Sequence, residues 1–199
     1  PQAVQDKIGA DPTGLPFNSV IALELHGGKP LSPLVNAGAI ATTSLINAEN
    51  VEQRWQRILH IQQQLAGEQV ALSDEVNQSE QTTNFHNRAI AWLLYSAGYL
   101  YCDAMEACDV YTRQCSTLLN TIELATLGAT LAAGGVNPLT HKRVLQADNV
   151  PYILAEMMME GLYGRSGDWA YRVGLPGKSG VGGGILAVVP GVIGIAAFS

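Results

Sequence analysis

Gly174-Leu175-Pro176-Gly177-Lys178-Ser179-Gly180-Val181-Gly182-Gly183-Gly184 is the stretch that decides the fold, because a long apolar run, Ile185 to Phe198, follows it directly. Pro190-Gly191 divides that run into Ile185 to Val189 and Val192 to Ala197, which predicts two short core strands joined as a hairpin. The glycines place a lysine and a hydroxyl where a ligand can approach the backbone. A phosphate-binding loop is excluded, because Arg172 stands where that loop needs a glycine and no helix follows.

Helical patterns dominate the chain before this stretch. Val51 to Gln69 predicts a helix with Trp55, Ile58, Ile61 and Leu65 on one face. Glu80 lies in a polar segment that leads into a helix from about Asn84 to Ala97. Further helices are expected at Asn36 to Asn47, Ala104 to Ser116, Thr121 to Ala133 and Gln146 to Glu160. The predicted fold class is α+β, with helices packed on an antiparallel sheet and the site at their junction.

Composition narrows the classes of function. The net charge of −6 and the absence of basic runs argue against nucleic-acid binding. Each half of the apolar run is too short to cross a bilayer, and no signal peptide is visible, so a cytoplasmic protein without membrane contact is expected. Cys102, Cys108 and Cys115 lack metal spacing and are interpreted as reduced thiols in one helical region. The four histidines are scattered, so no metal and no cofactor is expected.

Five segments form an ordered set along the chain: Pro33 to Ile40, Ser79-Glu80 with Asn87, Val110 to Ser116, Leu131 to Gly135, and Gly174 to Gly184. Taken together, they resemble the serine-dependent glutaminases of the bacterial glutaminase A type. The last of the five segments is similar to the Lys-Thr/Ser-Gly strand of penicillin-recognising serine hydrolases. The resemblance covers essentially the whole chain and implies a β-lactamase/transpeptidase-like fold, a single glutaminase domain over residues 1–199, and a homo-oligomer.

The family's nucleophile motif is not in this sequence. None of the serines has a lysine three residues later, so no Ser-x-x-Lys motif is present. In the family this motif lies upstream of a turn that matches Asp11 to Gly14, and a C-terminal helix follows the sheet. We therefore expect a domain truncated at both ends, whose serine nucleophile lies outside the chain.

The resemblance also implies a set of substrate-binding residues for L-glutamine. Glu80 matches the position that holds the α-ammonium, while Asn36, Asn87 and Tyr111 supply uncharged donors for the α-carboxylate. Taken singly, each has a simpler interpretation: Glu80 as a solvated helix residue, and either asparagine as a helix cap. The stretch Gln81 to Arg88 departs from the family, which often has a glycine and an Arg-Asn pair there. The resemblance therefore does not determine the shape of this loop.

Three residues near the glycine-rich stretch are implicated in the chemistry. Tyr163 matches an active-site tyrosine and is assigned to proton transfer, with contact to the substrate. Val181, on a glycine-flanked strand, supplies a backbone N–H for the oxyanion. Lys178 is either a site ammonium that lowers the pKa of a tyrosine or serine, or an exposed lysine at the start of a strand. Ser179 lines the site and is not the proposed nucleophile.

Three functions stay open at this point. The first is a glutaminase that hydrolyses L-glutamine to L-glutamate and ammonia through an acyl-enzyme. The second is a β-lactamase or peptidase relative, against which stand the absence of Ser-Asp-Asn and the presence of Glu80. The third is an amino-acid-binding module without catalysis.

Overall fold

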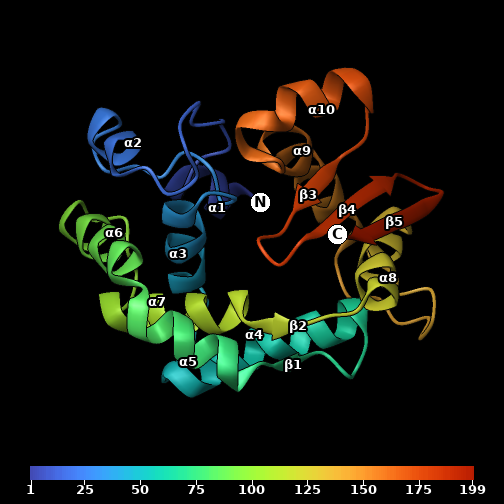
Figure 1. Ribbon diagram of the computed structural model, residues 1–199, viewed down its shortest axis with the longest axis horizontal. Helices are drawn as coiled ribbons and strands as arrows, with labels where there is room; N and C mark the ends of the chain where they lie inside the picture. Colours follow the sequence, from blue (N-terminus) through green and yellow to red (C-terminus); the bar gives the residue numbers. More distant parts are fainter. The chain divides into compact units, whose positions relative to one another are not determined.

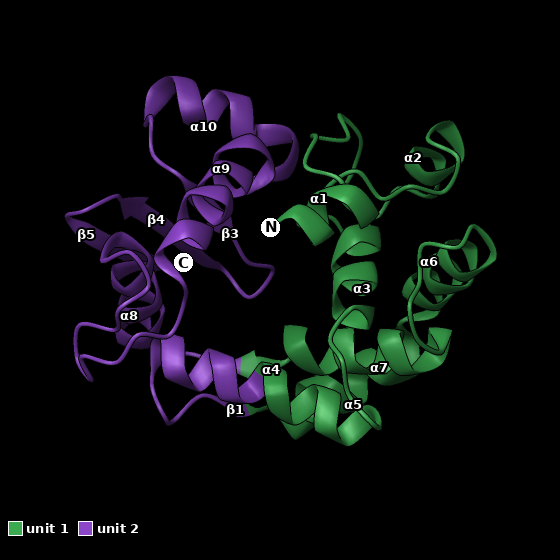
Figure 2. Cartoon of the chain, turned by 180° about the vertical axis from the view of Figure 1, so that it is seen from behind, with its two compact units in different colours: residues 1–58, 72–117 green, residues 59–71, 118–199 purple.

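The computed structural model describes residues 1–199, which divide into two compact units (Figure 2). Residues 1–58 and 72–117 form the first unit, and residues 59–71 and 118–199 form the second. The division falls inside helix α4 (Val51–Ala66) and at the short pair β1 (Ala71–Leu72) and β2 (Thr117–Leu118). Two compact units can belong to one domain, so the single domain over residues 1–199 stays a prediction.

The first unit consists of helices around a core of alanine and branched aliphatic side chains. Its helices besides α4 are α1 (Gln2–Lys7), α2 (Val20–Leu25), α3 (Asn36–Ser44), α5 (Asp74–Thr83), α6 (Phe85–Ser96) and α7 (Ala104–Cys115) (Figure 1). Ile40, Ile90 and Leu94 are fully buried between α3, α6 and α7. Burial of each such side chain stabilises the folded state by roughly 1.5–3 kcal/mol. Small residues such as Ala107 let the three helices approach closely.

The second unit packs helices on a three-stranded antiparallel sheet of order β3-β4-β5. Its elements are α8 (Thr121–Ala132), the 3₁₀ helix η1 (Ala147–Asn149), α9 (Val150–Glu160), η2 (Tyr163–Arg165), α10 (Ser166–Arg172), β3 (Gly177–Ser179), β4 (Gly184–Val189) and β5 (Ile193–Phe198). Leu186 and Val188 of β4 face Leu131 of α8 and Met157 of α9. This confirms the predicted class, with helices packed on an antiparallel sheet.

Two glycines allow α8 to lie against β5. A Cβ on Gly194 would lie 2.2 Å from the Ala129 nitrogen, and a Cβ on Gly128 would lie 3.0 Å from the Gly194 Cα. Any larger residue would push the helix away from the strand. The hairpin therefore packs on α8 through backbone as much as through side chains.

The structure corrects several sequence-based expectations. The polar segment around Glu80 is itself a helix, α5, which Ser73 caps and which buries no residue. Val181 lies in the turn between β3 and β4 instead of on a strand. Strand β5 is not a core strand, because Ile193 and Ile195 stay 50% and 47% exposed. Cys102 precedes α7, outside the predicted helix. None of the helices is long and apolar enough to cross a membrane.

Candidate active site

Three of the predicted substrate-binding residues form one hydrogen-bonded group in the first unit. Asn36 begins α3, Asn87 lies in the first turn of α6, and Tyr111 lies in α7. Asn36 Nδ2 donates to Asn87 Oδ1 at 2.9 Å, and the Tyr111 hydroxyl donates to Asn36 Oδ1 at 3.2 Å. All three side chains are half-buried. The fold therefore brings together residues that lie up to 75 positions apart in the sequence.

This group presents uncharged donors. The Asn36 amide is fixed in orientation, because its oxygen accepts from Tyr111 and its nitrogen donates to Asn87. The Asn87 oxygen is occupied in the same way, which leaves the Asn87 NH₂ and the second hydrogen of Asn36 Nδ2 as donors. Amide N–H groups bind a carboxylate without introducing a second charge. The arrangement suits the α-carboxylate of an amino acid.

Glu80 lies apart from these contacts. It is exposed on α5 and makes no side-chain hydrogen bond or ion pair. Its backbone carbonyl accepts from the Asn84 N–H at 2.9 Å, one turn later. An exposed carboxylate without a partner fits either a solvated helix residue or a group that waits for a ligand ammonium, so its role stays a prediction.

Tyr163 and Lys178 meet in the second unit. Lys178 Nζ, on β3, donates to the Tyr163 hydroxyl at 3.2 Å and also to the Ser179 carbonyl. The ammonium lies 4.4 Å from the centroid of the Tyr163 ring. Lys178 is half-buried and lies in the middle of β3 opposite Leu186, so it is not an exposed lysine at a strand end. An ammonium at this distance stabilises negative charge on the tyrosine oxygen.

The backbone at Tyr163 is held in an uncommon conformation. Its φ is +53°, which non-glycine residues seldom adopt. Gly161, two residues earlier, allows α9 to end directly against β3: the Ser179 N–H donates to the Gly161 carbonyl at 3.1 Å. A Cβ on Gly161 would lie 1.8 Å from the Gly177 carbonyl oxygen. In the sequence, only the glycines that flank Leu162-Tyr163 indicate this requirement.

The side chain of Val181 makes no packing contact that fixes it, and its backbone N–H is the group of interest. Its side chain is fully exposed, in the turn that closes with Gly180 N–H to Gly184 O at 2.7 Å and Gly183 N–H to Gly180 O at 3.1 Å. None of the hydrogen bonds of this turn uses the Val181 N–H. The role of this N–H as an oxyanion donor stays a prediction, and the strand on which the sequence placed it is a turn.

A second group of residues joins the α5–α6 junction to α7, and none of them was assigned to the site from the sequence. Asn84 is 6% exposed and its Nδ2 donates to Thr112 Oγ1 at 2.9 Å. Cys108, one turn before Thr112, is also buried, and this burial raises the pKa of its thiol to about 11. The thiol is therefore protonated and uncharged near neutral pH. No disulfide joins the three cysteines.

Comparison with known proteins identifies what this arrangement resembles. The sequence model of the glutaminase family matches residues 1–199. A curated glutaminase of Shigella boydii is 98% identical over all 199 residues, and the chain spans 64% of that relative's length. The solved structure of the probable glutaminase ybaS superposes with a TM-score of 0.99 at 99% identity, over 100% of this chain and 64% of its own.

A more distant solved structure shows the same fold. The Bacillus subtilis glutaminase YbgJ, in covalent complex with 5-oxo-L-norleucine formed by reaction with 6-diazo-5-oxo-L-norleucine, superposes with a TM-score of 0.87 at 30% identity. The match covers 100% of this chain and 65% of that one. The predicted resemblance in fold is thereby confirmed.

Proposed function

The chain belongs to the glutaminase family, and we propose that it forms the substrate-recognition and proton-transfer part of an enzyme. The proposed enzyme hydrolyses L-glutamine to L-glutamate and ammonia. The observation that carries the proposal is the group Asn36, Asn87 and Tyr111, whose amide donors suit an α-carboxylate. Glu80 takes the α-ammonium, because a carboxylate is its natural partner. Together these residues recognise a free amino acid instead of a peptide.

The proposed chemistry begins with a serine hydroxyl outside this chain. Its oxygen bonds to the side-chain amide carbon of glutamine while its proton passes to a base. The amide oxygen takes the negative charge and accepts from the Val181 N–H. When the tetrahedral intermediate collapses, the carbon–nitrogen bond breaks and the leaving nitrogen takes a proton, which releases ammonia. Water then attacks the acyl-enzyme, and glutamate leaves with the serine restored.

Tyr163 is the proposed proton carrier within this chain. Its oxygen accepts a hydrogen bond from the Lys178 ammonium. The positive charge of Lys178 stabilises the tyrosine phenolate, the form that accepts a proton. Lys178 thus acts through Tyr163 and through its field at the site. Ser179 is set aside as the nucleophile, because its hydroxyl donates to the Gly161 carbonyl at 3.5 Å.

The covalent complex of the Bacillus subtilis relative supports a nucleophilic route. The compound held there, 5-oxo-L-norleucine, has the carbon skeleton of glutamine with a methyl group in place of the amide nitrogen. A protein that bonds to such a ketone has a nucleophile beside the position of the scissile amide. This favours hydrolysis over the binding-module alternative for the present chain.

Cytoplasmic location and assembly into a homo-oligomer also stay proposals. The absence of disulfides among three cysteines fits a reducing compartment, and the family resemblance is the only support for the oligomer.

Ammonia release tests the proposal. In the full-length Shigella boydii relative, the matching segment is replaced by these 199 residues, which gives the exchanged Shigella boydii protein. Release of ammonia and glutamate from L-glutamine is then measured, and hydrolysis of a chromogenic β-lactam is measured beside it. We expect turnover of glutamine alone. The isolated 199-residue chain should give no ammonia above background, since loss of a nucleophile costs a factor on the order of 10⁶. Ordinary turnover by the isolated chain would place the nucleophile inside it, with Ser179 the first suspect, and β-lactam hydrolysis would favour the peptidase-like alternative.

A further inference from the structure

A single residue, Asn84, joins the helix that carries Glu80 to the helix that carries Asn87. Helix α5 ends at Thr83 and α6 begins at Phe85. The Asn84 N–H donates to the Glu80 carbonyl at 2.9 Å, and the Asn84 carbonyl accepts from the Arg88 N–H at 3.1 Å. The backbone of this one residue therefore belongs to both helices. Its position sets the direction of both.

The Asn84 side chain does not act as a helix cap. An asparagine before a helix usually accepts from one of the first N–H groups of that helix, but no such bond forms at the start of α6. The side chain is turned inward instead and is 94% buried, where Nδ2 donates to Thr112 Oγ1 at 2.9 Å. Asn84 therefore makes a tertiary hydrogen bond in place of a helix cap, and this bond holds the α5–α6 junction against α7.

Thr112 is a fixed partner and lies next to Tyr111. It is 3% exposed, and its own hydroxyl donates to the Cys108 carbonyl at 2.9 Å, so its oxygen is directed toward Asn84. The Ser116 hydroxyl in turn donates to the Thr112 carbonyl at 2.8 Å. The Asn84–Thr112 bond consequently joins the α5–α6 junction to the turn of α7 that presents Tyr111.

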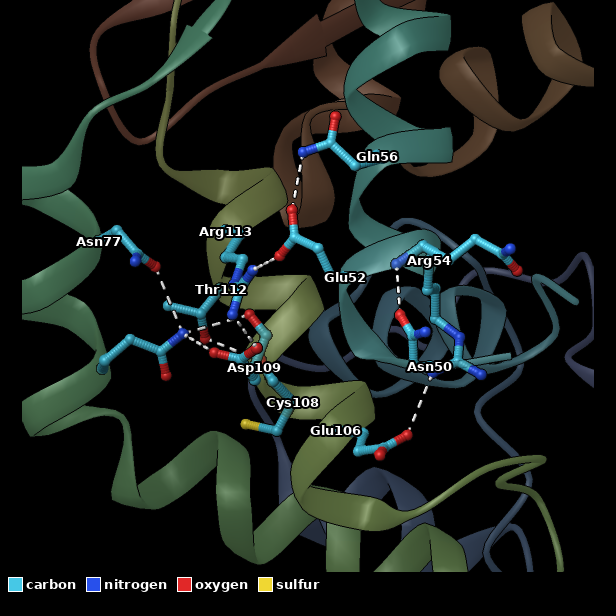
Figure 3. Close-up of polar contacts among 12 residues, drawn as sticks. Asn50, Glu52, Arg54, Gln56, Asn77, Glu106, Cys108, Asp109, Thr112 and Arg113 are labelled. Carbon is cyan, nitrogen blue, oxygen red and sulfur yellow. Dashed lines mark hydrogen bonds and ion pairs between the residues drawn. The ribbon is translucent and has the colours of Figure 1, made fainter. Parts of the chain in front are cut away.

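A second connection supports α5 but lies nearer to solvent. Gln81 Nε2 donates to Asp109 Oδ1 at 2.6 Å, and Arg88 donates to the Gln81 carbonyl at 2.6 Å. Asp109 pairs with Arg113 at 2.9 Å, and Arg113 reaches Glu52 of α4 at 2.9 Å (Figure 3). Partly exposed contacts of this kind hold a position less firmly than a fully buried hydrogen bond. The buried bond of Asn84 is the stronger constraint.

A pocket that is partly open to solvent lies between the junction and α7. A cavity of about 360 Å³ is lined by Gln81, Asn84, Arg88, Met105, Cys108 and Asp109. Because apolar packing does not fill this space, the junction depends on hydrogen bonds for its position. Loss of the Asn84 bond would therefore let α5 and the first turn of α6 move relative to Tyr111, while Ile90 and Leu94 keep the rest of α6 packed on α3 and α7.

We propose that Asn84 is a positioning residue for glutamine recognition: through Thr112 it sets Glu80 and Asn87 relative to Tyr111 so that all three address one ligand. The inference rests on the proposed function. Asn84 itself does not touch the ligand or the reacting atoms. Because the residues that it positions hold the same parts of the substrate before and during the reaction, its loss raises KM and leaves kcat nearly unchanged.

Four variants of the exchanged Shigella boydii protein test this inference. We expect Asn84→Ala and Thr112→Val each to raise KM for glutamine about tenfold, with kcat within about twofold of the parent. Thr112→Ser keeps the hydroxyl and should retain the parental KM. The double variant Asn84→Ala/Thr112→Val should be no worse than the more severe single variant, because both changes remove one bond.

The control is Thr82→Val, which removes a hydroxyl of α5 that is exposed and donates only to the Ser79 carbonyl. It should leave KM and kcat unchanged. Circular dichroism and thermal unfolding report the fold of each variant, and Thr112→Val carries the test if Asn84→Ala does not fold.

Three results would overturn the inference: an unchanged KM in a folded Asn84→Ala or Thr112→Val, a kcat that falls as much as KM rises, or additive effects in the double variant. A parent that releases no ammonia from glutamine would instead refute the proposed function, and the inference with it.

Discussion

Replacement of Tyr163 by phenylalanine separates catalysis from structure, because it removes a single oxygen. That oxygen accepts from Lys178 Nζ at 3.2 Å. The ring remains, with the ammonium 4.4 Å from its centroid, and Lys178 keeps its bond to the Ser179 carbonyl. The change removes the partly exposed hydrogen bond between the Tyr163 hydroxyl and Lys178. The free energy of unfolding should fall by no more than about 1 kcal/mol.

The effect on turnover should be far larger. Proton transfer by a positioned side chain contributes about 10²- to 10⁴-fold to the rate, which is about 3 to 5 kcal/mol of activation free energy. We therefore expect kcat to fall by that factor, with KM for glutamine within about threefold of the parent. The assay is ammonia release by the exchanged Shigella boydii protein, with thermal unfolding measured on the same samples. Tyr171→Phe is the matched control, because Tyr171 is 92% exposed.

A rise in KM without a fall in kcat would refute the reasoning. Tyr163 would then be a binding residue, and Tyr111 would inherit proton transfer. A large loss of thermal stability would also count against it, since it would show that the hydroxyl serves the fold.

Three other predictions follow from the structure, and the second has a control variant. Glu80→Gln should raise KM at least tenfold with kcat retained, because the ligand ammonium loses its charged partner, and parental kinetics would remove Glu80 from the site. Gly161→Ala places a Cβ 1.8 Å from the Gly177 oxygen and 2.4 Å from the Met157 oxygen, so unfolding should become easier by about 1–3 kcal/mol and activity should fall. Gly164→Ala should have neither effect, because no atom lies within 4 Å of a Cβ at that position. Equal melting temperatures of the Gly161→Ala and Gly164→Ala variants would contradict the steric argument. Iodoacetamide at pH 8 should alkylate exposed Cys115 and spare Cys108, because burial raises the Cys108 pKa to about 11 and leaves about one thiol in a thousand ionised. Alkylation of Cys108 should increase as the pH approaches 11 or the chain unfolds, and equal labelling of both cysteines in peptide mass spectra at pH 8 would be inconsistent with the burial.

The sequence predicted the longer helices to within a few residues, because their apolar positions recur at helical spacing. Helix α6 was expected from about Asn84 to Ala97 and spans Phe85–Ser96. Helix α5 was missed for the converse reason, since it buries nothing and shows no apolar stripe. Its signal was the cap: Ser73 followed by Asp74 and Glu75 in the first turn.

The candidate site was predictable as a set of residues but not as contacts. The spacing of Asn36, Asn87 and Tyr111 matched a family pattern, but the pattern does not say which amide faces which oxygen. Asn84 carries no motif, and its burial depends on the α7 side chains that it meets. The division at Ile58 was also invisible, because it falls inside a continuous helix and no linker marks it.

The uncharged donors of the first unit also bear on the release of product. Glutamate differs from glutamine by an added negative charge on the side chain, while the α-carboxylate is the same in both. In the proposed site, amide donors at Asn36 and Asn87 would bind that shared group without a net positive charge that favours the more anionic product. An arginine in their place would attract glutamate more strongly than glutamine over several ångströms. The ammonium of Lys178 donates to the Tyr163 hydroxyl and to the Ser179 carbonyl, so two of its hydrogens are directed away from the ligand. In the proposed function, uncharged donors for the α-carboxylate would therefore add no cation that favours glutamate, which would limit inhibition by the product.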